Sequence, residues 1–128
     1  MCATFADEIS LEELRAEAVE AAEDRIAGLD RLLEACRKGN AAPEQALADI
    51  RQLAHSLKGL AATYESRVLL KLSHSLEDYL AGRERLDAET LTGAQLYVDR
   101  MAEALDDHFD ADEAAAEPYL TKIRNAMK

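Results

Sequence analysis

Apolar residues recur at every third or fourth position along most of the chain, which is the spacing of helices with one buried face. The first such stripe consists of Leu11, Leu14, Ala18, Ala22, Ile26, Leu29, Leu33 and Cys36. Ser10 and Glu13 have the spacing of a capping box at its start, although the pattern is also compatible with a start near Thr4. Gly39 suits the left-handed turn that ends a helix, and Pro43 suits the first position of the next one. The sequence therefore predicts a long first helix followed by a short loop.

Three further stripes predict three more helices. Their apolar positions are Leu47, Ile50, Leu53, Leu57, Leu60 and Tyr64 in the second helix, Leu69, Leu72, Leu76 and Leu80 in the third, and Leu91, Ala94, Val98, Met101 and Leu105 in the fourth. We expect the second helix to run from about Pro43 to Tyr64. Ser66 is placed to cap the third helix, which Gly82 should end, and Asp87 is placed to cap the fourth.

The pattern weakens after His108, where Pro118 is expected to break or start a helix. We place a short fifth helix at Pro118 to Lys128, with Leu120, Ile123 and Met127 inward. Only 5 Gly and 2 Pro occur in the 128 residues, and 5% of the residues are aromatic, which favours helices over sheets. We therefore expect an all-α fold, an up-and-down antiparallel four-helix bundle with an additional short C-terminal helix, and a single domain over residues 1–128.

The charge balance restricts the partners. The chain has 26 acidic and 15 basic residues, for a formal net charge of −11, and this charge repels nucleic acid and anionic membrane surfaces. No apolar stretch is long enough for a transmembrane helix, and the first ten residues lack the features of an export signal. We expect a cytoplasmic, monomeric protein in which Cys2 and Cys36 are reduced thiols.

One histidine of the second helix occupies an unusual position. At 100° per residue, His55 lies almost opposite the apolar stripe and therefore points to solvent. Gly59 and Ala62 follow on the same face, so little side-chain bulk surrounds the imidazole. A glycine in a helix interior is unfavourable by about 0.5–1 kcal/mol, which suggests that another molecule must approach closely there. Lys58 falls on the neighbouring ridge, within reach of a phosphoryl group carried by the ring.

The third helix supplies groups that could assist this histidine. His74 and Glu77 share one face of that helix, away from its leucines. If the second and third helices are antiparallel neighbours, this face borders His55 and Lys58. A carboxylate that accepts a hydrogen bond from one ring nitrogen fixes the tautomer and leaves the other nitrogen as a nucleophile.

Two runs of the sequence carry a resemblance to a known family. The run from Ala54 to Tyr64, AHSLKGLAATY, resembles the His-x-x-Lys-Gly motif of histidine phosphotransfer domains, most closely that of CheA-type chemotaxis kinases. The later run from Leu72 to Leu80, LSHSLEDYL, is similar to the segment of that family that carries a His and a Glu. The similarity is good from about Pro43 to Leu80, and the remainder matches only as a helical pattern. Leu60 stands where the family usually has a small residue, and Glu65 stands where a Gly commonly ends the motif.

The resemblance implies a role for each candidate residue. By this resemblance His55 is the phosphoacceptor, Glu77 holds its other ring nitrogen, and Lys58 and His74 complete the network. The residues expected to contact a partner around His55 are Ser56, Gly59 and Ala62.

The implied function is that of a phosphocarrier rather than a stand-alone enzyme, because the chain has no glycine-rich nucleotide loop and no room for a kinase domain. Its partners would be a histidine kinase or receiver as donor and a response-regulator receiver as acceptor, and that receiver would supply the aspartate and the Mg²⁺. We expect no cofactor or metal on the chain itself. The beginning at Met1 favours a free-standing relay protein over an excised domain of a larger kinase. Two alternatives remain open, namely a metal site made of His55, His74 and Glu77 and a helical adaptor without phosphotransfer.

Overall fold

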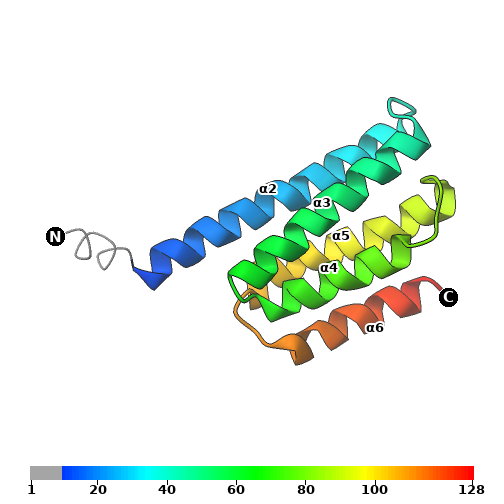
Figure 1. Ribbon diagram of the computed structural model, residues 1–128. Helices are drawn as coiled ribbons and strands as arrows, with labels where there is room; N and C mark the ends of the chain where they lie inside the picture. The colour runs from blue at the N-terminus through cyan, green and yellow to red at the C-terminus, as the bar shows by residue number, and fades with distance from the viewer. Residues whose placement is uncertain (1–9) are drawn as a thin grey trace.

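Five α-helices and one short 3₁₀ helix make up the computed structural model, which describes residues 10–128. They are α2 (Leu11–Arg37), α3 (Pro43–Thr63), α4 (Arg67–Leu80), α5 (Ala88–His108), the 3₁₀ helix η1 (Glu113–Ala116) and α6 (Glu117–Ala126). Each of the first four α-helices packs on the next, and α5 packs back on α2, so that they close an up-and-down antiparallel bundle (Figure 1). Helix α6 lies outside this ring and packs on α5 and η1. No strand occurs in residues 10–128, and the predicted all-α fold is confirmed.

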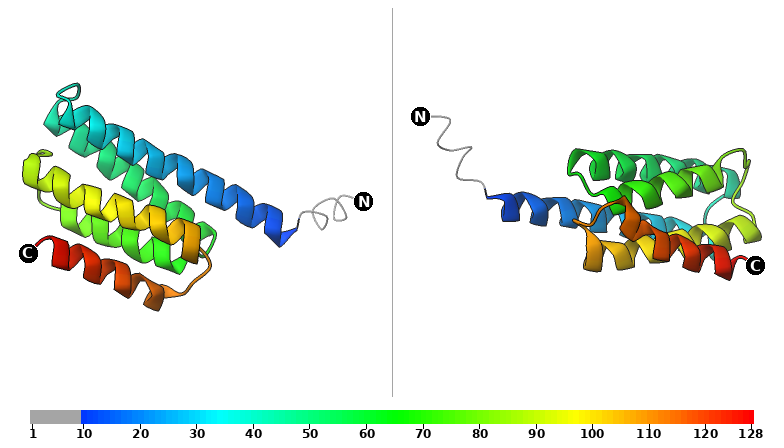
Figure 2. Two further views of the ribbon diagram at one scale, coloured as in Figure 1. Left: turned by 180° about the vertical axis from the view of Figure 1, so that it is seen from behind. Right: turned by 90° about the horizontal axis from the view of Figure 1, so that it is seen from below.

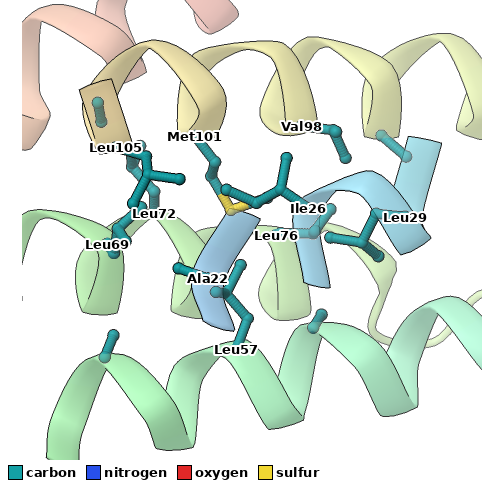
Figure 3. Close-up of a cluster of buried hydrophobic side chains, with 14 of the residues drawn as sticks. Ala22, Ile26, Leu29, Leu57, Leu69, Leu72, Leu76, Val98, Met101 and Leu105 are labelled. Carbon is teal, nitrogen blue, oxygen red and sulfur yellow. The ribbon is translucent and has the colours of Figure 1, made fainter. Parts of the chain in front are cut away.

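The bundle is held together by apolar side chains from all four main helices. Ile26 of α2, Leu57 of α3, Leu76 of α4 and Met101 of α5 converge in its centre (Figure 3), and each is at most 4% exposed. Burying one such side chain contributes about 1.5–3 kcal/mol. The predicted stripe of the third helix is buried throughout, since Leu69, Leu72, Leu76 and Leu80 are all fully inaccessible. This core fixes the helices that present the polar site.

The ends of the helices show where capping was predicted well and where it was not. Ser10 accepts a hydrogen bond from the Glu13 amide at 3.0 Å, and Asp87 accepts one from the Thr90 amide at 2.8 Å, as predicted. Ser66 occupies the N-cap position of α4, as predicted, but its side chain makes no capping bond. Its buried hydroxyl instead donates to the Phe109 carbonyl oxygen at 2.7 Å. Ser66 thus ties the start of α4 to the end of α5.

Several apolar residues that were predicted to be buried are exposed. Leu11 is 82% exposed and Leu14 is 37% exposed, because the first turns of α2 extend past the other helices (Figure 2). Tyr64 and Met127 are also exposed, and both lie at the caps that follow α3 and α6. Half-buried positions of the predicted stripes are Cys36, Leu53, Leu60 and Leu91. The possible start near Thr4 lies outside the described residues.

The C-terminal region differs in detail from the prediction. A 3₁₀ helix that was not predicted precedes α6, and α6 begins at Glu117 rather than at Pro118. Asp112 starts the 3₁₀ helix by accepting a hydrogen bond from the Ala114 amide at 3.1 Å. Phe109, for which no role was predicted, is 3% exposed. Its burial, with that of Tyr119, Leu120 and Ile123, attaches the C-terminal segment to the bundle.

Two helix ends adopt the same left-handed turn with different residues. Gly39 follows α2 with φ of 77°, and Glu65 follows α3 with φ of 59°. After α3, the amide of Glu65 donates to the Ala62 carbonyl at 3.3 Å, and the amide of Ser66 donates to the Ala61 carbonyl at 2.8 Å. This pair of bonds forms a Schellman motif. Glu65 therefore adopts after α3 the left-handed conformation that Gly39 adopts after α2.

Cys36 is a free thiol beside the Leu86 carbonyl, whereas Cys2 lies outside the described residues. Among residues 10–128, no helix combines the length and the apolar character needed to cross a bilayer.

Candidate functional site

Helix α3 presents His55 to solvent because its buried face lies on the other side. Ala54 and Leu57 are fully buried, whereas the His55 side chain is 76% exposed. Gly59 and Ala62 are exposed on the same helix, and a Cβ atom built on Gly59 would meet no atom within 4 Å. The packing of the chain itself therefore does not require a glycine there. The open surface leaves room for another molecule to approach the imidazole.

Glu77 of α4 bridges His55 and Lys58 of α3. Its Oε2 atom lies 3.3 Å from Nδ1 of His55, and its Oε1 atom lies 2.6 Å from Nζ of Lys58. When Nδ1 carries the ring proton it donates to the carboxylate, and the free electron pair is then on Nε2. The structure thus brings together three of the four residues that were predicted to form the network.

The bridging carboxylate is well suited to stay ionised. Burial alone would raise the pKa of Glu77, but hydrogen bonds from Lys58 and His55, together with their charges, outweigh burial and hold this pKa below its ordinary value of 4.5. The Glu77 side chain is 24% exposed and that of Lys58 is 29% exposed, so solvent screens the pair only in part. At neutral pH Glu77 is therefore a fixed negative charge beside the imidazole.

His74 is not brought to His55 or Glu77. It lies on α4 with its Nε2 atom 3.4 Å from Oδ2 of Asp78, and both side chains are exposed. It faces instead a cavity that Lys58 also lines. Over the part of the chain that the structure describes, no group of three His, Cys, Asp or Glu side chains is placed to hold a metal ion. The residues of the alternative metal site are therefore not arranged as a ligand set.

Two arginines that were not predicted to take part also hold the site. Arg51, one turn before His55, donates through Nη2 to the carbonyl oxygens of Leu80 at 2.6 Å and Arg83 at 2.7 Å. It thereby ties α3 to the C-terminal end of α4, where a cation is also favoured by the helix dipole. Arg25 of α2 donates through Nε to the hydroxyl of Ser56 at 2.9 Å.

The sequence gives only a partial signal for Arg51. Arg51 is recognisable as a charged residue one turn before His55, on the flank between the buried and the exposed faces of α3. Its partners are backbone carbonyl groups of another helix, which no side-chain pattern reveals.

A comparison with protein families supplies the identity of the fold. The model of the Hpt domain matches residues 13–111, which include every residue of the site described above. Neither a curated protein nor a solved structure matches the chain. Helix α6 lies beyond the matched region. Because the match extends over most of the sequence and contains the His55 site, the chain belongs to the Hpt family of histidine phosphotransfer domains.

Proposed function

We propose that His55 carries the phosphoryl group and that its Nε2 atom forms the bond to phosphorus. Histidine phosphotransfer in phosphorelay signalling follows from membership of the Hpt family. The single observation that supports the choice of residue and atom is the contact between Nδ1 of His55 and Glu77 at 3.3 Å on an otherwise exposed ring. That contact leaves Nε2 as the nucleophile.

The transfer step uses the two ring nitrogens for different tasks. The lone pair of Nε2 attacks the phosphorus of a phosphorylated donor, and a P–N bond forms while the bond from phosphorus to the donor's oxygen or nitrogen breaks. The broken bond's electrons leave with the donor. The proton on Nδ1 stays on the ring, which becomes positively charged, and the Glu77 carboxylate stabilises that charge. Attack by an acceptor aspartate reverses these changes.

Lys58 stabilises the group in transit. Its ammonium is 2.6 Å from Glu77 and lies on the same helix as His55, three residues on. A short rotation of its flexible side chain brings the charge toward the phosphoryl oxygens, where it offsets their negative charge. In this proposal His74 does not contact the imidazole of His55. It lines the neighbouring cavity together with Lys58.

The proposed donor of the phosphoryl group is a histidine kinase or a receiver, and the proposed acceptor is a response-regulator receiver. The receiver brings the aspartate and the Mg²⁺ ion that it needs for its own chemistry. The segment from Ala54 to Tyr64 resembles the corresponding segment of CheA-type kinases, so a kinase domain of that type is the first donor to test. We also propose that the chain works as one unit, because the buried core is continuous from α2 to α6.

Radiolabel transfer tests the assignment. A receiver domain that carries a labelled phosphoryl group is mixed with the wild-type chain or with His55→Gln. The stability of the label on the chain is then measured in acid and in alkali. The wild type should acquire an acid-labile, alkali-stable label, whereas His55→Gln should acquire none and keep its helical circular dichroism. Label on His55→Gln would refute the assignment. No label on the wild type from any kinase or receiver would favour the helical adaptor.

A further inference from the structure

The contact between Glu77 and the imidazole of His55 depends closely on the position of α4. Oε2 of Glu77 lies 3.3 Å from Nδ1 of His55, at the long end of the range for a hydrogen bond, whereas Oε1 lies 2.6 Å from Nζ of Lys58. The flexible side chain of Lys58 can follow the carboxylate if α4 shifts, and the imidazole, with only two rotatable bonds, follows less readily. A retreat of α4 by about 0.5 Å would therefore break the contact with His55 and keep that with Lys58.

Arg51 joins the same two helices one turn away from this contact. It precedes His55 by four residues on α3, and its acceptor Leu80 follows Glu77 by three residues on α4. At a rise of about 1.5 Å per residue, the Arg51 bridge lies roughly 6 Å from His55 along α3 and roughly 4.5 Å from Glu77 along α4. Because the two helices are antiparallel neighbours (Figure 1), the two bridges cross the same interface side by side. The position of one bridge therefore limits the position of the other.

The Arg51 bridge fixes the end of α4 in a way that apolar packing does not. Its Nη2 atom donates to the carbonyl oxygens of Leu80 at 2.6 Å and Arg83 at 2.7 Å, which are short distances for a charged donor. The leucines on either side of Glu77, Leu76 and Leu80, are fully buried, but apolar burial is non-directional, whereas two hydrogen bonds to fixed carbonyl groups also specify direction. Over residues 10–128, no other side chain of α3 hydrogen-bonds to the backbone of α4.

Arg51 acts on the position of Glu77 and not on its charge. Burial raises the pKa of Glu77, and the hydrogen bonds and charges of Lys58 and His55 lower it. The guanidinium of Arg51 is instead directed at carbonyl oxygens at the end of α4 and in the loop that follows. An effect of Arg51 on the reaction therefore passes through the distance between Glu77 and His55.

We propose that Arg51 is a positioning residue for phosphoryl transfer, because its two hydrogen bonds hold α4 where Glu77 reaches Nδ1 of His55. This inference rests on the proposed function. A neutral imidazole free in water carries its proton mainly on Nε2, so Nε2 has a free lone pair in most molecules only while Glu77 holds the proton on Nδ1. Without the Arg51 bridge, the proton returns to Nε2 in most molecules, and the attacking nitrogen is blocked.

Substitutions at both ends of α4 separate positioning from general stability. Arg51→Met keeps the apolar stem and removes both hydrogen bonds, and Arg51→Gln, whose side chain is too short to make them, replaces it if Arg51→Met does not fold. Arg51→Lys is the rescue variant, because both bonds come from the single atom Nη2 and one ammonium group can make both. Ser66→Ala is the matched control, since it removes a hydrogen bond of 2.7 Å at the opposite end of α4.

Two measurements report the position of Glu77, and neither involves a docking partner. ¹⁵N NMR gives the fraction of His55 rings that carry the proton on Nδ1, with His74 as the internal reference because its contact is with Asp78 of its own helix. The rate at which phosphoramidate, a small phosphoryl donor, phosphorylates His55 gives the reactivity of Nε2. Both are also measured for Arg51→Met in a Glu77→Ala background, where a residue that acts only through Glu77 has no further effect.

We expect Arg51→Met to shift the His55 proton from Nδ1 to Nε2 and to slow phosphorylation about fivefold, because the contact with a charged carboxylate is lost. Arg51→Lys should keep at least about half of the wild-type rate. In the Glu77→Ala background, the further loss caused by Arg51→Met should be less than about 1.5-fold. Ser66→Ala should lower Tm and leave the tautomer and the rate unchanged.

The role of Arg51 would be overturned by an unchanged tautomer in Arg51→Met, by an equal change in Ser66→Ala, by the absence of rescue in Arg51→Lys, or by the same loss of rate in the Glu77→Ala background. Phosphotransfer itself would stand in each of these cases. If the wild type takes up no phosphoryl group from phosphoramidate or from any receiver, the proposed function fails. The tautomer of Arg51→Met then still decides whether Arg51 positions Glu77.

Discussion

Replacing Glu77 with glutamine isolates the contribution of its charge to phosphotransfer. Glutamine has nearly the same shape and can still accept a hydrogen bond from Nδ1 of His55. A hydrogen bond to a charged group contributes about 1.5–3 kcal/mol, and one between neutral groups contributes about 0.5–1.5 kcal/mol. The substitution should therefore remove roughly 1 kcal/mol from the stabilisation of the charged, phosphorylated ring. Since 1.36 kcal/mol corresponds to tenfold in rate, phosphorylation of His55 should slow about fivefold.

Single-turnover transfer from a phosphorylated receiver measures this rate, and ¹⁵N NMR of the imidazole measures the fraction of molecules that carry the ring proton on Nδ1. Both should fall in Glu77→Gln, while binding of the receiver should change little, because only 24% of the Glu77 side chain is exposed. Asp78→Asn is the matched control, since Asp78 lies next along α4 and contacts His74 rather than His55. An unchanged rate and an unchanged tautomer in Glu77→Gln would show that the carboxylate is only a structural charge.

The remaining predictions concern pH, docking and the turn after α3. The pKa of Glu77 is lower in the folded protein than its ordinary value. The stability that Glu77 contributes is therefore present above its unfolded-state pKa and is lost as the pH falls through its folded-state pKa. In a series of thermal melts, the difference in Tm between wild type and Glu77→Gln should vanish over that pH range. Gly59→Glu should leave Tm equal or slightly higher, because the position is open and helix propensity improves. It should nevertheless block phosphoryl transfer through its bulk and charge. A normal transfer rate would argue against close docking over that turn. Glu65→Gly should stabilise the fold by roughly 0.5–1 kcal/mol, because glycine removes the strain of a φ of 59° and loses part of that gain to chain entropy. Denaturant titration checks this value, and an equal gain in Glu65→Ala would contradict the explanation.

Most of the fold follows from local rules that the sequence displays. The stripe Leu69, Leu72, Leu76 and Leu80 predicts a buried face because side chains three or four residues apart share one side of a helix. The placement of His55 opposite such a stripe is equally local. Asp87 and Ser10 were recognisable as caps because a capping bond joins residues only three apart.

The predictions that failed depend on contacts between distant segments. Leu11 continues the apolar stripe of α2, but whether it is buried depends on how far the neighbouring helices extend. Ser66 has the residue type of a cap, yet a carbonyl 43 residues later binds its hydroxyl. The face shared by His74 and Glu77 was visible, whereas the rotation of α4 that brings only Glu77 to His55 comes from core packing.

The hydrogen bonds from Arg51 to the end of α4 have a consequence for the modularity of the site. Together with the Glu77 bridge, they attach α4 to α3 on both sides of His55 along the chain, so the proposed phosphoacceptor and the carboxylate and ammonium beside it come from one helical hairpin spanning residues 43–83. Helices α2 and α5 bury its apolar side, and hydrogen bonds also join it to its neighbours, among them those from Arg25 to Ser56, from Ser66 to the Phe109 carbonyl oxygen and from Arg83 to Thr90. Grafted onto another antiparallel bundle with matching contacts, this hairpin would bring the proposed nucleophile, the carboxylate beside it, the nearby ammonium and the Arg51 hydrogen bonds that join α3 to α4.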